Sequence, residues 1–80
     1  MLAMEHQTLN AEQVAQTVAE AIRAAGHSQR QVAEGTGIAL VTLNRRLTGH
    51  TPFTIAELSA VAKFLGCSVS DFIARAEAVA

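Results

Sequence analysis

The chain contains 80 residues, which corresponds to one small domain, and its formal net charge at neutral pH is −1. Half of the residues are hydrophobic but only three are aromatic, so we expect a small core of Ala, Val, Leu and Ile side chains in closely packed helices. No apolar stretch approaches the roughly 20 residues of a membrane span, and the first residues lack the pattern of a signal peptide. The single cysteine excludes an internal disulfide bond, and we expect a cytoplasmic location.

The first helix is predicted over residues 11–25, after an N-terminal arm, residues 1–9, that we expect to be flexible. Asn10 and Gln13 have the spacing of a capping box, in which each side chain accepts a hydrogen bond from the backbone amide of the other residue. Apolar residues follow at helical spacing, and Gly26 provides a left-handed stop.

The second helix is predicted over residues 29–35 and begins with another capping box, formed by Ser28 and Gln31. Gly35 and Gly37 follow closely. This density of glycine predicts the end of the helix and a tight turn of the chain.

The third helix is predicted over residues 39–47, with Leu43 and Leu47 on one face. Its start is the least clearly marked boundary in the chain. Neither Ile38 nor Ala39 carries a side chain that accepts a hydrogen bond from a backbone amide.

Two more helices, over residues 55–65 and 69–79, complete the prediction of an all-α chain of five helices joined by short turns. Each of them is preceded by a capping box, and the two pairs are Thr54 with Glu57 and Ser68 with Asp71.

Two small residues suit a close contact between the second and third helices. Ala33 fits where two helices cross steeply, and Gly37, four positions later, fits a turn that requires positive φ. These spacings resemble the helix-turn-helix of the phage-repressor, Cro and XRE-type family. The resemblance covers about residues 10–73 and continues through three further stretches, 47–49, 54–58 and 62–69.

The resemblance implies a compact five-helix, lambda-repressor-like domain over residues 10–80, with the helix-turn-helix at about 28–48. Such a domain binds double-stranded DNA. One position departs from the family pattern, because Arg46 stands where an apolar residue is usual, and we expect Leu47 to take over its packing role. That change is expected to rotate the third helix slightly.

The resemblance further implies that the third helix enters the major groove. Base edges would be read by Leu40, Val41, Asn44 and Arg45, with Arg45 suited to guanine, Asn44 to adenine and the two apolar side chains to thymine methyl groups. Phosphates would be held by Gln29, Thr42, Arg46, Thr48, His50, Thr51 and Thr54.

The distribution of charge favours this interpretation more than the net charge does. Residues 1–22 contain three acidic side chains and no basic one, whereas residues 23–63 contain five basic and two acidic ones. Few cations also mean few neutralised phosphates, so we expect weak nonspecific binding and a shallow dependence on salt.

The leading hypothesis is a transcriptional repressor of phage or prophage type, whose partner is a double-stranded DNA operator. An antitoxin-type interaction module that also represses its own operon is an alternative, and so is a recombination or architectural DNA-binding factor. A homodimer through helix 69–79 would use the apolar stripe Phe72, Ile73, Ala76 and Val79. The same stripe would alternatively close the core of a single domain. A separate alternative is that the chain is the DNA-binding part of a longer repressor.

No enzyme activity, cofactor, metal site or small-molecule substrate is predicted. The sequence has no glycine-rich phosphate loop and no pair of acids at catalytic spacing. His27 and His50 are interpreted as a turn residue and a phosphate neighbour, and their spacing from Cys67 does not match a zinc site.

Overall fold

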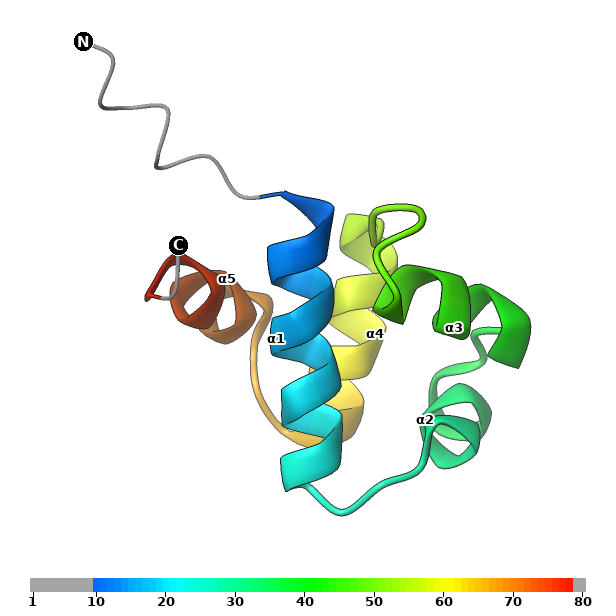
Figure 1. Cartoon of the computed structure of the whole chain (residues 1–80). Coiled ribbons are helices and arrows are strands. Elements are labelled where there is room, and N and C mark those ends of the chain that lie inside the picture. Colours follow the sequence, from blue (N-terminus) through cyan, green and yellow to red (C-terminus); the bar gives the residue numbers. More distant parts are fainter. Residues whose placement is uncertain (1–9, 79–80) are drawn as a thin grey trace, which may run out of the picture.

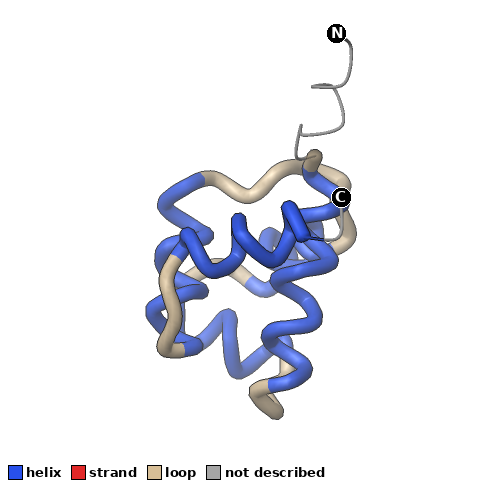
Figure 2. The backbone as a smooth tube through the Cα atoms, turned by 90° about the vertical axis from the view of Figure 1, so that its left-hand side faces the viewer, coloured by secondary structure: helices blue, strands red, loops and turns tan. Residues whose placement is uncertain are grey.

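The structure is a computed structural model that describes residues 10–78, and these form helices and loops without a strand (Figure 2). The helices are α1 (Ala11–Ala24), α2 (Gln29–Thr36), α3 (Leu40–Leu47), α4 (Ile55–Leu65) and α5 (Val69–Ala78). The prediction of an all-α, five-helix domain is confirmed, and the described ends differ from the predicted ones by no more than one residue. The arm expected at residues 1–9 and Val79 of the apolar stripe lie outside the described residues.

The start of nearly every helix is determined by a local pair of side chains. The Asn10 side chain accepts from the Gln13 amide at 2.8 Å, and the Gln13 side chain accepts from the Asn10 amide at 3.1 Å. The same reciprocal pairs occur before α2, α4 and α5. Helix α3 is different, because Ala39 makes no side-chain cap. Its start must therefore be held by packing and by the preceding turn.

The core lies where all five helices meet. The largest fully buried side chains come one from each helix, and they are Val18, Val32, Leu43, Val61 and Phe72. Helix α1 contacts α3 and α5, while α2 contacts α3 and α4. As Figure 1 shows, α2 and α3 therefore lie on one side of α1 and α5 lies on the other. The predicted core of small aliphatic side chains is present, with Phe72 buried among them.

The turn between α2 and α3 depends on Gly37, which has φ +81° and donates its amide to the Ala33 carbonyl at 2.9 Å. A Cβ atom there would meet nothing within 4 Å, so the backbone conformation rather than lack of space requires the glycine. Gly35 has another role than the predicted one. It lies inside α2, where a Cβ atom would overlap the ring of Phe64, and so it allows α2 to approach α4 closely.

We predict that Gly37→Ala lowers the free energy of unfolding by about 1–2 kcal/mol, because an L side chain is disfavoured in the left-handed conformation. Urea unfolding followed by circular dichroism measures this loss. Gly37→Asn is the matched control and should lose less, since asparagine tolerates positive φ. Equal stability of the alanine variant and the wild type would contradict this explanation of the turn.

Candidate nucleic-acid interface

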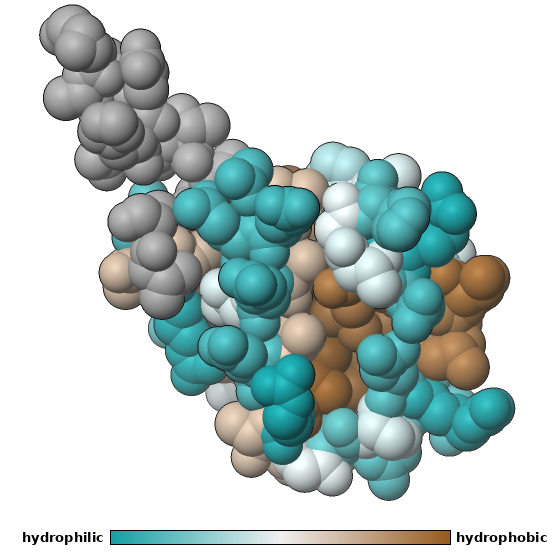
Figure 3. Space-filling model, viewed as in Figure 1, coloured by the Kyte–Doolittle hydropathy of each residue, from teal (hydrophilic) through white to brown (hydrophobic). Residues whose placement is uncertain are grey.

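Helix α3 buries one face and exposes the opposite one. Leu43 is completely buried, whereas Val41 is 69% exposed and Leu40 36% exposed. Asn44 and Arg45 are also exposed. All four residues predicted to read bases therefore project away from the core. Figure 3 shows apolar surface at its right-hand edge, where Figure 1 places the beginning of α3.

The beginning of α2 and the outer face of α3 form one continuous surface. A shallow depression on it is lined by Gln29, Arg30, Leu40, Val41 and Asn44. The Asn44 side-chain amide donates to the Gln29 side-chain carbonyl at 3.2 Å and so connects the two helices across the depression. The second proton of the Asn44 amide and its own carbonyl oxygen remain for an outside partner.

Arg30 is a residue of this surface that the sequence interpretation missed. It is exposed, follows Gln29 in the first turn of α2 and lines the depression beside Leu40 and Val41. The signal was present, because a basic side chain next to a predicted phosphate contact is itself a candidate for phosphate binding.

The loop between α3 and α4 contributes hydroxyl groups with defined hydrogen bonds. The Thr51 hydroxyl accepts from Arg46 at 2.7 Å, and the Thr54 hydroxyl accepts from the Glu57 amide at 3.0 Å. Because both act as acceptors here, each keeps its proton to donate outward. The Thr48 hydroxyl instead donates to the Arg45 carbonyl at 3.1 Å and lies 3.1 Å from Nδ1 of His50. Thr42 is half-buried.

Arg46 has a partner that the sequence interpretation did not foresee. Its Nε donates to Oε1 of Glu57 at 2.7 Å, and its Nη2 donates to Oε2 of the same carboxylate at 3.2 Å. With the Nη1 bond to Thr51, three of its donors are engaged inside the domain. The hydrogen bond from Arg46 is the main cause that lowers the pKa of Glu57, and the bond to Glu57 raises the pKa of Arg46.

The Glu57 carboxylate also accepts from the Thr54 backbone amide at 2.9 Å, which completes the capping box of α4. One carboxylate therefore begins α4 and holds the end of α3. We call this group of Arg46, Glu57, Thr51 and the Thr54 amide the α3–α4 clasp.

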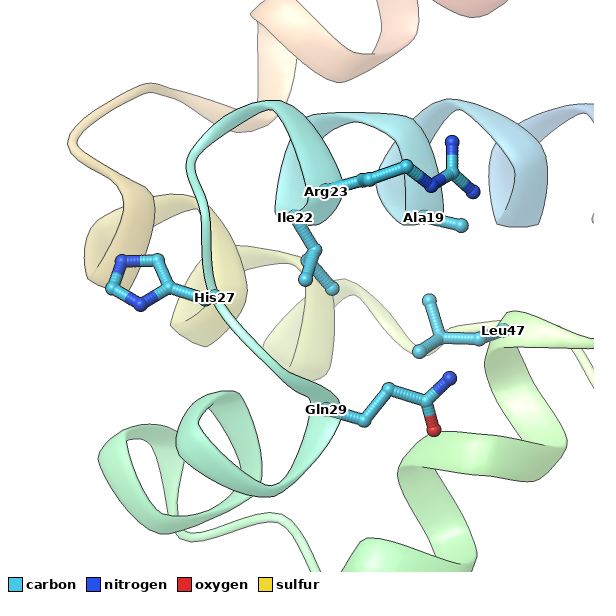
Figure 4. Close-up of a pocket in the computed structure, with 6 residues that line it drawn as sticks. All are labelled: Ala19, Ile22, Arg23, His27, Gln29 and Leu47. Atoms are coloured by element: carbon cyan, nitrogen blue, oxygen red, sulfur yellow. The ribbon is translucent and has the colours of Figure 1, made fainter.

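A groove lies between the C-terminal half of α1 and parts of α2 and α3 (Figure 4). Ala19 and Ile22 of α1 form one wall and Leu47 of α3 the other, while Arg23, His27 and Gln29 also line it. Leu47 is half-buried and packs against the core cluster, so it has the packing role that was expected of it. The His27 ring packs against Phe64, with 4.9 Å between the ring centroids.

Comparison with known families agrees with this geometry. A family model described as helix-turn-helix matches residues 18–72, which is more than half of the chain. The chain belongs to the XRE-type helix-turn-helix family, and the resemblance noted from the sequence is confirmed. No curated protein and no solved structure matches it significantly.

Membership of this family supports sequence-specific binding of double-stranded DNA and a role in transcription regulation. The family is a regulatory one and is not normally enzymatic. Within residues 10–78, no helix has the length and apolar character needed to cross a membrane, and no group of three or more potential metal ligands lies together.

We predict that the α3–α4 clasp makes stability depend on acidity. Since the folded state lowers the pKa of Glu57, the stabilisation is present above the ordinary glutamate pKa of about 4.3 and is lost as the pH falls through the lower folded value. Thermal unfolding between neutral and acidic pH should show a steeper loss for the wild type than for Glu57→Gln.

Part of the acid sensitivity should remain in this variant. The backbone and hydroxyl of Ser68 lower the pKa of Asp71 at the start of α5, and that contribution is unchanged. If the wild type and Glu57→Gln lose the same stability as the pH falls, protonation of Glu57 is not the cause of the acid sensitivity.

Proposed function

We propose that this domain is a transcriptional repressor of the phage or prophage type, which covers a promoter by placing α3 in the major groove of an operator. The observation that carries the proposal is the division of α3 into two faces. Leu43 anchors the helix in the core, while Val41, Asn44 and Arg45 project outward together. A repressor acts through affinity and placement on the DNA, and this outward face is the surface to which we assign both.

The outward face combines the chemistries that read base edges. Arg45 carries the fork of donors that matches guanine, and Asn44 carries the amide that matches adenine. Leu40 and Val41 offer apolar contact to thymine methyl groups, so the first turn of α3 favours A·T pairs. Each good bidentate contact contributes about 1–3 kcal/mol of discrimination.

Phosphate contacts on both sides of α3 would fix the domain on the duplex. At one side we place the Gln29 side chain and the amides of the first turn of α2, a helix terminus with positive partial charge, together with Arg30. At the other side we place the hydroxyl protons of Thr51 and Thr54. The remaining members of the proposed phosphate set are Thr42, Thr48 and His50.

The proposal also concerns whether one or two copies of the domain bind each operator. Phe72 and Ala76 of α5 are buried inside the domain, which favours the interpretation that this stripe closes the core. Ile73 is half-buried, so among the described residues of the stripe it is the one that leaves apolar surface for a homodimer. Selection of binding sites from random duplexes, read by sequencing, distinguishes a dimer from a monomer. A palindromic site reports a dimer and one asymmetric site reports a monomer.

We predict that Arg45→Ala weakens binding to the selected operator by about 1–3 kcal/mol and relaxes the preference at one base pair, because it removes a bidentate base contact. Fluorescence anisotropy with the operator and its single-base variants measures both effects.

The matched control is Arg75→Ala, which removes an exposed arginine from α5, beside Gln16, Thr17 and Glu20 of α1. This variant should bind the operator almost as the wild type does. Equal losses in the two arginine variants would show that α3 does not read the DNA. Failure of the wild type to select any duplex at low salt would overturn the proposed function itself.

A further inference from the structure

We propose that Arg46 positions the recognition helix instead of binding a phosphate, and that the α3–α4 clasp thereby determines the specificity of the interface. This inference rests on the proposed function and assigns a role to one residue pair within it. The residues concerned touch no base. They act through the orientation of the side chains at the other end of α3.

The hydrogen bonds of Arg46 favour this role. Its guanidinium donates to both oxygens of Glu57 and to the Thr51 hydroxyl, at distances between 2.7 and 3.2 Å. The Arg46 and Glu57 side chains are only 20% and 18% exposed. A DNA phosphate would have to displace the Glu57 carboxylate, which Arg46 contacts through two hydrogen bonds. Otherwise it would have to approach that carboxylate although both groups are negatively charged. The ion pair is neutral as a whole, so it offers DNA no net attraction.

Helix α3 also needs such an anchor. It is the one described helix that starts without a side-chain cap, at Ala39. Its polar side-chain attachments to other helices are the Asn44 bond to Gln29 and the α3–α4 clasp. The first is a single bond between exposed amides, whereas the second is a partly buried, two-point ion pair.

The size of a small tilt shows why the anchor matters. An eight-residue helix is about 12 Å long, so a tilt of about 10° moves one end by about 2 Å relative to the other. Functional contacts require placement to within about 0.5 Å. A tilt of this size would misplace Leu40 and Val41 while leaving Leu43 buried. Release of the clasp should therefore reduce specificity before it unfolds the domain.

The test compares Glu57→Gln with the wild type on the selected operator and on a scrambled duplex. Glutamine keeps the α4 capping box, because a side-chain carbonyl at this position still accepts from the Thr54 amide. If Arg46 positions α3, the ratio of operator affinity to scrambled affinity falls by about tenfold, roughly the discrimination of one base contact. If Arg46 binds phosphate, removal of its competing carboxylate strengthens binding to both duplexes and leaves the ratio unchanged, which would overturn the inference.

Glu34→Gln is the matched control for charge. Glu34 is exposed on α2 and lines the surface beside Arg30 and Leu40. Its removal should strengthen binding to both duplexes equally, since one repulsive charge is lost. A result for Glu57→Gln that resembles Glu34→Gln would contradict the positioning role.

Arg46→Lys keeps the positive charge but loses the planar fork that meets both carboxylate oxygens. The positioning role predicts the same fall in the affinity ratio with an unchanged salt slope, and wild-type behaviour of this variant would overturn it. Circular dichroism at the assay temperature verifies that both variants are folded. A wild type that selects no duplex refutes the proposed function, whereas a selective wild type with unaltered variants refutes only this inference.

Discussion

The proposed function of this domain depends on how one short helix is held. Helix α3 has eight residues, a length at which an isolated helix is unstable in water, and it lacks a side-chain cap. Tertiary contacts therefore stabilise α3. Leu43 is buried in the core, Leu47 packs against the core cluster, and Arg46 forms the ion pair with Glu57. Because these contacts occupy one side of the helix, the other side remains exposed to solvent.

Much of the fold could be predicted from the sequence because its helix boundaries are coded locally. A capping box spans four residues, and a left-handed glycine acts on its own position, so pairs such as Ser28 with Gln31 and single residues such as Gly37 can be interpreted without tertiary information. The outward face of α3 was predictable for a related reason, since the buried position of Leu43 determines which residues lie opposite.

The features that the sequence interpretation missed involve residues far apart in the chain. The glycine spacing predicts a turn at Gly35, but the missing side chain there accommodates the ring of Phe64, 29 positions later. Arg46 and Glu57 were each given local roles, as a phosphate contact and a helix cap. Neither role indicates that the two side chains meet across the loop between α3 and α4. Contacts of this kind depend on how helices pack, and helix propensity carries no information about that packing.

The charge of the domain and the geometry of its interface are connected. The chain has six basic and seven acidic side chains, and the ion pair with Glu57 neutralises Arg46, which lies next to the proposed recognition surface. Under the proposed function we therefore expect general attraction to the phosphate backbone to be weak, with affinity coming from base contacts and from hydrogen bonds donated by amides and hydroxyl groups. Such contacts are short-ranged and directional, so they tolerate little misplacement of α3. Under the proposed function, a domain with few cations gains more from a recognition helix that the Arg46–Glu57 pair holds in position than from a further free arginine.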